Sequence, residues 1–214
     1  MGQLLSAAIT AYCEANSSPV PDYLKALERD TFLKQLNPTM MSDPMQGRFL
    51  AFLSHLTRPQ RILEVGSFTG YSALCLAEGL TSGGRITAVE IDEEKESTIR
   101  HFFERAGMTD RLDLHIGNGL QIVPELDPGF DIVFIDANKR DNALLYDLVF
   151  SKLAPGGLLL VDNTLWFGKV LEEGVDTDTD LIRSFNLKLT QDDRTQNLLL
   201  PIRDGITLVR KLSD

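Results

Sequence analysis

The sequence contains few of the residues that build disulfide or zinc scaffolds, and it has no long apolar run. Its 214 residues include two cysteines, Cys13 and Cys75, and three histidines. The cysteines form no CxxC pair and stand at no metal-ligand spacing from a histidine, which argues against a disulfide framework or a zinc ribbon and predicts two reduced thiols. Apolar runs such as 158–161 and 198–200 are far shorter than the roughly 18 residues of a membrane-spanning helix. We therefore expect no membrane partner.

Basic residues are also scarce, with 21 Lys and Arg against 31 Asp and Glu and a net charge of −10. Binding to the nucleic-acid backbone without sequence preference needs a basic surface, so a nucleic-acid partner is disfavoured. The first 18 residues have no basic leader before their apolar positions, which predicts an amphipathic helix rather than a signal peptide. We expect a cytoplasmic protein whose ligand is a neutral or cationic small molecule.

The chain is long enough for one large core, and we expect a single domain over residues 1–214, with N-terminal helices in 1–40. Short apolar runs alternate with helix-length amphipathic segments, which predicts an α/β fold with a mostly parallel sheet. The expected parallel strands are 61–66, 85–91, 111–117, 130–136 and 157–162.

Helix and hairpin signals complete this pattern. Asp43 fits an N-cap, followed by Pro44 at the first helical position. Two apolar runs, 198–203 and 206–210, flank Asp204-Gly205, which predicts a hairpin with a tight turn. The expected helices are 22–36, 44–56, 72–81, 93–106, 140–153 and 178–189. We therefore predict a Rossmann-like, doubly wound sheet of seven strands that ends in an antiparallel hairpin, with helices on both faces.

A glycine-bearing turn follows the first expected strand. Gly66 and Gly70 let the backbone approach a ligand closely, but Phe68 stands where the second glycine of GxGxxG would be. This disfavours an NAD-dependent oxidoreductase and predicts a nucleoside without a pyrophosphate. Glu90 ends the next strand, 26 residues after Glu64, where a carboxylate can accept hydrogen bonds from both ribose hydroxyls. The alternative interpretation of Glu90 is a solvated carboxylate at a strand end.

Two further strand ends carry oxygen ligands, Asp136 on one and Asp162-Asn163 on the next. Parallel strands bring their carboxyl ends to one edge, so we expect these side chains together. Two carboxylates and one amide oxygen suit Mg²⁺ or Ca²⁺ better than zinc, since no histidine lies near them in the sequence. Asp and Asn also commonly end strands and shape turns, so the spacing alone does not decide between a metal site and a structural one.

Five motifs occur together in this chain: Glu64–Ala73, Phe130–Lys139, Leu153–Gly157, Asp162–Trp166 and Leu200–Gly205. With them, the sequence from Met40 to Lys211 resembles the cation-dependent class I O-methyltransferases, the group that contains catechol and caffeoyl-CoA O-methyltransferases and bacterial relatives. The resemblance implies an enzyme that moves the methyl group of S-adenosylmethionine to a hydroxyl of a small aromatic diol. It also implies a homodimer, with N-terminal helices near the acceptor pocket.

Residue roles follow from matching motifs. The resemblance implies that Asp136, Asp162 and Asn163 bind the divalent metal, Mg²⁺ or else Ca²⁺ or Mn²⁺, and that Lys139 and Asp136 are catalytic, with Lys139 beside the acceptor hydroxyl. The residues implied to hold S-adenosylmethionine are Met40, Ser42, Glu64, Gly66, Ser72, Glu90, Asn118, Gly119 and Asp136. Asn138, Gly119 and Asn142 depart from the common family pattern, which leaves the shape of the acceptor pocket open.

The chemistry needs an activated oxygen, because a phenol with a pKa near ~10 is mostly protonated at neutral pH. Chelation of a diol by a divalent cation stabilises its anionic form, and Lys139 is the candidate base that accepts the proton. Trp166 is either an apolar wall against the aromatic ring or a core residue. Two other functions stay open: methylation of a hydroxylated uridine in tRNA, which the acidic charge disfavours, and binding of S-adenosylmethionine without catalysis.

Overall fold

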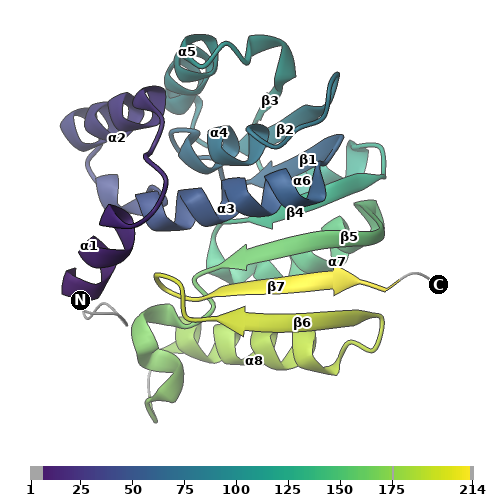
Figure 1. The fold of residues 1–214 in the computed structure, drawn as a ribbon. Helices are drawn as coiled ribbons and strands as arrows, with labels where there is room; N and C mark the ends of the chain where they lie inside the picture. Colours follow the sequence, from purple (N-terminus) through teal and green to yellow (C-terminus); the bar gives the residue numbers. More distant parts are fainter. Residues whose placement is uncertain (1–6, 175, 213–214) are drawn as a thin grey trace.

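A computed structural model describes residues 7–174 and 176–212. Its centre is one sheet of seven strands in the order β3-β2-β1-β4-β5-β7-β6 (Figure 1). The strands are β1 Arg61–Val65, β2 Arg85–Glu90, β3 Leu112–Ile116, β4 Phe130–Ile135, β5 Leu153–Asp162, β6 Thr195–Leu200 and β7 Ile206–Lys211. The first five strands pair in parallel, and β7 runs antiparallel to both of its neighbours. The predicted fold class is confirmed.

Helices cover both faces of the sheet (Figure 1). They are α1 Ala7–Ala15, α2 Asp22–Lys34, α3 Pro44–Thr57, α4 Tyr71–Ala77, α5 Glu96–Arg105, α6 Gly119–Glu125, α7 Asn142–Lys152 and α8 Thr177–Gln191. Short 3₁₀ turns are η1 Pro38–Met40, η2 Glu93–Lys95, η3 Thr109–Arg111, η4 Lys139–Asp141 and η5 Trp166–Leu171. The predicted N-cap is confirmed, since the Asp43 side chain accepts a hydrogen bond from the amide of Gln46 and Pro44 opens α3.

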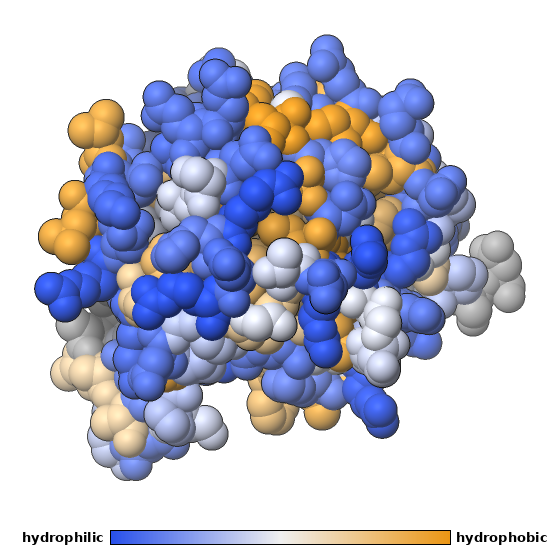
Figure 2. Space-filling view, turned by 90° about the horizontal axis from the view of Figure 1, so that it is seen from above, coloured by the Kyte–Doolittle hydropathy of each residue, from blue (hydrophilic) through white to orange (hydrophobic). Residues whose placement is uncertain are grey.

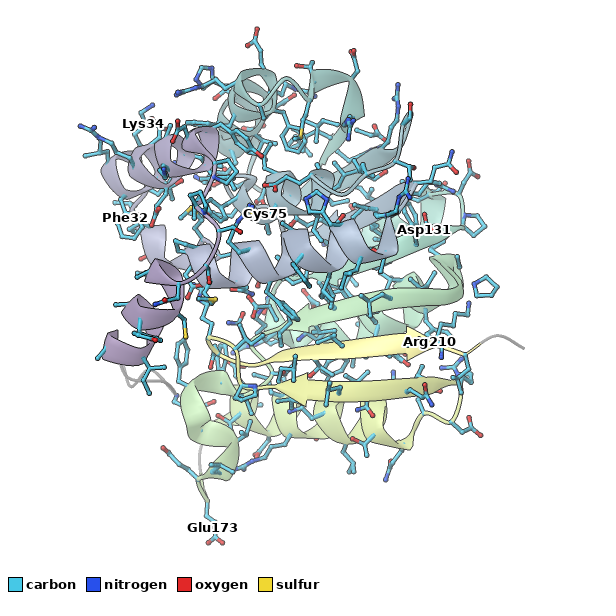
Figure 3. All side chains as sticks on the ribbon, in the orientation of Figure 1. Phe32, Lys34, Cys75, Asp131, Glu173 and Arg210 are labelled. Atoms are coloured by element: carbon cyan, nitrogen blue, oxygen red, sulfur yellow. The ribbon has the colours of Figure 1, made fainter. Side chains whose placement is uncertain are left out.

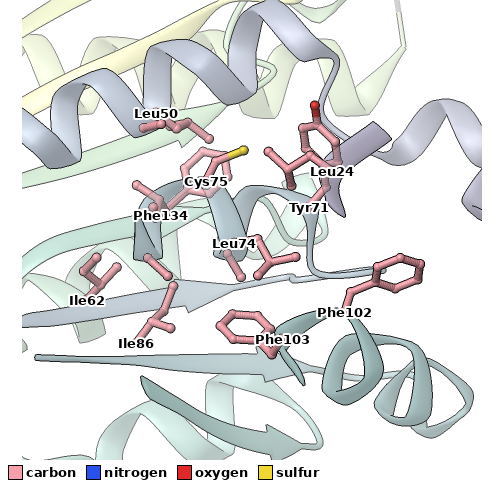
Figure 4. Packing of buried hydrophobic residues seen from close by; sticks show 14 of the residues in the cluster. Leu24, Leu50, Ile62, Tyr71, Leu74, Cys75, Ile86, Phe102, Phe103 and Phe134 are labelled. Atoms are coloured by element: carbon pink, nitrogen blue, oxygen red, sulfur yellow. The ribbon is translucent and has the colours of Figure 1, made fainter. Parts of the chain in front are cut away.

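Each face of the sheet has its own hydrophobic core, which explains why the central strands are apolar runs rather than alternating ones. On β1, Ile62 packs into the core beneath α2–α5, and the next residue, Leu63, packs into the core beneath α6–α8. On β4, Ile132 packs into the first of these cores and Val133 into the second. Figure 4 shows the first core, in which Ile62 lies among side chains from α4 and α5.

The main differences from the sequence-based expectation lie in the hairpin turn, in the start of β5 and in α6. The hairpin is present, but the prediction of a tight two-residue turn was wrong. Leu200 pairs with Ile206, so five residues, 201–205, connect the strands. The side chain of Asp204 in this connection accepts hydrogen bonds from Phe167 and Asn163, which hold the connection away from a tight turn. Strand β5 starts four residues earlier than expected, and α6 was not predicted because it is short and contains Pro124.

The carboxyl ends of the parallel strands lie on the side of the molecule where α1 and η5 are drawn in Figure 1. Figure 3 places Phe32 of α2 on this side, and Asp131 and Arg210 on the opposite one. The face seen in Figure 2 is largely hydrophilic, with smaller groups of hydrophobic residues between. Within the described residues, no helix combines the length and apolar character that crossing a membrane would require.

Candidate active site

A cavity of about 1200 Å³ lies at the carboxyl edge of the sheet, covered by residues of α1–α3 and η1. We divide it into two ends by the strands that supply its walls. The glycine-turn end follows β1, β2 and β3 and is lined by Gly66, Phe68, Glu90, Gly117, Asn118 and Gly119. The carboxylate end follows β4, β5 and β6 and is lined by Asp136, Lys139, Asn163, Trp166, Arg203 and Asp204.

Gly66 shapes the glycine-turn end. Its φ is +94°, and a Cβ at this position would overlap the carbonyl oxygen of Asp136. The turn is held against the neighbouring strands, because the Gly66 amide donates to Val89 O and the Asp136 amide to Val65 O, each over 2.9 Å. Only glycine combines this dihedral angle with this close approach.

Glu90 stands on the wall of the same end and is 6% exposed. Its Oε2 accepts a hydrogen bond from the Phe68 amide over 2.6 Å, and its Oε1 accepts one from the Asp92 amide over 2.9 Å. Burial raises the pKa of Glu90, and these backbone donors oppose that shift. A carboxylate has about four acceptor positions, so it can still accept from two ligand hydroxyls.

Three predicted ligand-binding residues lie behind the cavity wall instead of on it. Glu64 is fully buried and accepts a hydrogen bond from Ser67 Oγ over 2.5 Å, and its Oε1 has no hydrogen-bond partner among the described residues. Burial raises the pKa of Glu64 to about 7, against hydrogen bonds from Ser67 and Ser72. Ser42 is also buried, and its Oγ has no such partner either. Through Ser67, Glu64 supports the glycine turn from below.

Two aspartates meet at the carboxylate end. Asp136 Oδ1 accepts a hydrogen bond from Lys139 Nζ over 2.8 Å. Asp162 is fully buried at the end of β5; its Oδ1 accepts from the Asn163 amide, and its Oδ2 has no hydrogen-bond partner within the described part of the chain. Burial, and then the negative charge of Asp136, raise the pKa of Asp162 to about 6. A fully buried carboxylate beside a second, partly buried one needs a nearby positive charge.

Asn163 is oriented by the C-terminal hairpin. Its φ is +58°, a conformation that Asn tolerates better than most residues. Its Nδ2 donates to Asp204 Oδ2 over 3.2 Å, and Asp204 Oδ1 accepts from the Phe167 amide. With the Asn163 nitrogen bonded in this way, its oxygen is the atom left for another partner.

A family model described as O-methyltransferase matches residues 14–212 of this chain. The chain belongs to the O-methyltransferase family. The caffeoyl-CoA O-methyltransferase of Populus kitakamiensis is 33% identical over 226 residues, which cover 99% of this chain and 96% of that protein. Two solved structures agree with this assignment.

One of them is a methyltransferase of Podospora anserina with S-adenosylhomocysteine bound, with a TM-score of 0.88, 28% identity and 99% of both chains covered. The other is the O-methyltransferase TomG of Streptomyces achromogenes with S-adenosylmethionine, with a TM-score of 0.87, 26% identity and 96% of both chains covered. The protein is thus an S-adenosylmethionine-dependent O-methyltransferase of the caffeoyl-CoA and catechol type, as predicted, and the oxidoreductase alternative is excluded.

The structure brings most of the predicted site residues of this O-methyltransferase to one cavity. Those on its wall are Met40, Gly66, Glu90, Asn118, Gly119, Asp136, Lys139 and Asn163, and those one layer behind are Ser42, Glu64, Ser72 and Asp162. No three His, Cys, Asp or Glu side chains gather in a metal-binding arrangement within residues 7–174 and 176–212. The predicted set does not need three, because its third donor is the Asn163 amide.

Sequence reasoning missed two residues of this end, Arg203 and Asp204. Both fall in the motif Leu200–Gly205, but they were interpreted as hairpin residues. Their site contacts reach Gln46, Asn163 and Phe167, which are distant in the sequence. A charged pair directly after the apolar run 198–202 was the available signal.

Proposed function

We propose that this O-methyltransferase transfers the methyl group of S-adenosylmethionine to one hydroxyl of a small vicinal aromatic diol, such as a catechol or a caffeoyl compound, with a divalent cation at the carboxylate end. The observation that carries the proposal is Oδ2 of the fully buried Asp162, which has no hydrogen-bond partner among the residues that the structure describes. The negative charge of Asp136 acts on the same carboxylate and raises its pKa. The nearest positive charge to this oxygen, Arg203 Nη1, stands 4.0 Å away and donates no hydrogen bond to it. A buried carboxylate oxygen in this position favours a directly bound cation.

The donor set suits that partner. Asp136, Asp162 and the Asn163 oxygen would hold Mg²⁺, or Ca²⁺ or Mn²⁺, because these cations prefer carboxylate and amide oxygens. When bound to both oxygens of a diol, such a cation stabilises the phenolate and fixes the direction of its oxygen. Asp204 supports this arrangement by holding the Asn163 nitrogen, which leaves the amide oxygen for the cation.

Lys139 is placed to handle the proton. Its side chain is 12% exposed, and Asp136 holds its Nζ at 2.8 Å on the cavity wall. A phenolic hydroxyl must lose its proton before or during methyl transfer, since the neutral phenol is a weak nucleophile. We assign Lys139 as the group that accepts this proton once the bound cation, in place of the lysine, balances the charge of Asp136. Asp136 is the residue that also positions Lys139.

The glycine-turn end would hold the methyl donor. The fixed carboxylate of Glu90 would accept hydrogen bonds from the ribose hydroxyls, and the Gly66 turn allows the backbone to approach the ligand. Met40, Asn118 and Gly119 would complete this wall, with Glu64, Ser72 and Ser42 supporting it from behind.

An aromatic acceptor fits the walls of the other end. Trp166 lines the cavity, which favours its role as an apolar wall over that of a core aromatic. Its ring centroid lies 5.6 Å from that of Phe167, which lines the cavity as well. The relative from Populus kitakamiensis is named for a caffeoyl-CoA substrate, which supports a phenolic acceptor here.

The test measures methyl transfer from labelled S-adenosylmethionine to catechol, caffeoyl-CoA and tRNA that carries a hydroxylated uridine, with Mg²⁺ or with EDTA. We expect turnover of a catechol-type acceptor that falls at least roughly 100-fold in EDTA and in Asp162→Asn, because the oxygen nucleophile is then not activated. The matched control Asp180→Asn changes a carboxylate that is 67% exposed and should retain activity. EDTA-resistant transfer would overturn the metal assignment, and transfer to tRNA alone would replace the acceptor class.

A further inference from the structure

Arg203 joins the C-terminal hairpin to the segment that covers the cavity. It lies in the β6–β7 connection with a φ of +52°, a conformation that L residues with long side chains rarely adopt. Its Nη1 donates to Gln46 Oε1 over 3.0 Å, and its Nη2 donates to the carbonyl oxygen of Thr39 over 2.5 Å. The guanidinium is therefore held in place by α3 and η1, although its backbone belongs to the opposite end of the chain.

The same guanidinium faces the buried carboxylate. Arg203 Nη1 lies 4.0 Å from Asp162 Oδ2, which is the oxygen that has no hydrogen-bond partner within the described residues. The Arg203 side chain is 22% exposed and that of Asp162 is fully buried, so the pair is only partly screened by water. Arg203 thus sits as a fixed positive charge beside an oxygen that it does not bond.

The two carboxylates of the proposed metal site therefore each have a cationic side chain nearby. Lys139 Nζ forms a hydrogen bond with Asp136 over 2.8 Å, whereas Arg203 Nη1 lies 4.0 Å from Asp162 and forms none with it. With Asp204 and Asp141, the carboxylate end carries four acidic and two basic side chains, which leaves less negative charge for a divalent ion than the acidic residues alone suggest.

We propose that Arg203 sets the affinity of the carboxylate end for its divalent cation, by repelling the ion from Asp162 while its own contacts with Gln46 and Thr39 prevent it from moving away. The inference rests on the proposed metal site and adds a residue that is not a ligand. Removal of a unit charge at this range from a bound dication should tighten binding by roughly tenfold or more.

The experiment is calorimetric titration of the full-length protein, freed of metal, with MgCl₂ at fixed ionic strength. Arg203→Lys keeps the charge, whereas Arg203→Gln removes it and carries the same backbone cost at positive φ. Arg203→Gly also removes the charge, and glycine adopts the positive φ without strain. It therefore provides a second uncharged variant in case Arg203→Gln folds poorly. We expect the Kd for Mg²⁺ to fall roughly tenfold or more in the Gln and Gly variants and to stay near the wild-type value in the Lys variant. The gain should disappear when Asp162→Asn is added to Arg203→Gln.

The sign of the change separates charge from structure. If Arg203 only held Gln46 and Thr39 in place, its removal would loosen the site, and Mg²⁺ would bind with unchanged or lower affinity in the Gln and Gly variants. That result, with a wild type that binds Mg²⁺, would overturn the inference and leave the proposed function intact. No binding of Mg²⁺ to any protein of the series, together with EDTA-resistant transfer, would overturn both.

Discussion

The two ends of the cavity are built in different ways. At the glycine-turn end, backbone atoms make the wall: Gly66 turns with positive φ, and the Phe68 amide donates to Glu90. At the carboxylate end, charged and polar side chains make the wall, and they bond to one another across long stretches of sequence, as Arg203 does with Gln46 over 157 positions. The first end depends on backbone contacts between neighbouring strands, and the second on side-chain contacts between distant segments.

This difference predicts different responses to mutation. A backbone-built wall has no room for a larger residue, so it should fail when a Cβ is added. A wall of charged side chains should tolerate changes of shape but respond to changes of charge and of hydrogen-bonding capacity. The predictions below test both expectations, in order of decreasing effect.

The largest effect is expected for Gly66→Ala. The new Cβ would overlap the carbonyl oxygen of Asp136, and the φ of +94° is strained for alanine. We expect a loss of more than about 4 kcal/mol in the free energy of unfolding, or no folded protein, because backbone lies on both sides of the clash. Denaturant unfolding measures this loss.

Gly83→Ala is the matched control for this experiment. Gly83 also has a positive φ, +76°, but a Cβ there would meet no atom within 4 Å. We expect a cost of only about 1 kcal/mol from the backbone conformation. Equal losses in the two variants would show that the close approach to Asp136 has no part in the effect.

The contrast between the ends also explains what the sequence could predict. The strands β1, β2, β4 and β5 were recognised because both faces of the sheet are buried there. Gly66, Glu90 and Asp136 were recognised because each directly follows or ends a strand. Arg203 was missed because its partners, Gln46 and Thr39, become its neighbours only after the hairpin packs beneath η1. Long-range contacts between polar side chains leave no periodic pattern in a sequence.

Glu64 gives the glycine-turn end a pH dependence. Burial raises its pKa in the folded protein from the ordinary 4.5 to about 7, so the folded state binds this proton more tightly than the unfolded state. The resulting stability is fully present below the unfolded pKa and is lost as the pH rises through about 7. Between pH 5 and pH 8, the free energy of unfolding of the wild type should fall by up to about 3 kcal/mol because of Glu64. Glu64→Gln does not titrate, so its free energy of unfolding should not show this fall.

Urea unfolding at a series of pH values, in EDTA, tests this prediction. Glu93→Gln is the control, because it changes an exposed glutamate in η2 and should leave the wild-type pH profile in place. A Glu64→Gln profile parallel to that of the wild type would contradict the prediction, since Glu64 would then have the same pKa in both states.

The smallest effect, at the carboxylate end, is expected for Asp204. Asp204→Ala removes the acceptors of the Phe167 amide and of Asn163 Nδ2, and should reduce the free energy of unfolding by about 2 kcal/mol. Asp204→Asn keeps an oxygen for Phe167, so it should cost about 1 kcal/mol.

The two Asp204 variants separate stability from activity. In Asp204→Asn the new amide nitrogen would face Asn163 Nδ2, and two donors cannot pair. Asn163 would then turn its oxygen toward residue 204 and away from the cavity, so methyl transfer should fall more than the small loss of stability explains. Parallel denaturation and transfer assays test this. If Asp204→Asn keeps full activity, the orientation of the Asn163 amide has no part in the site, and the carboxylate end depends on its two aspartates without the hairpin's support.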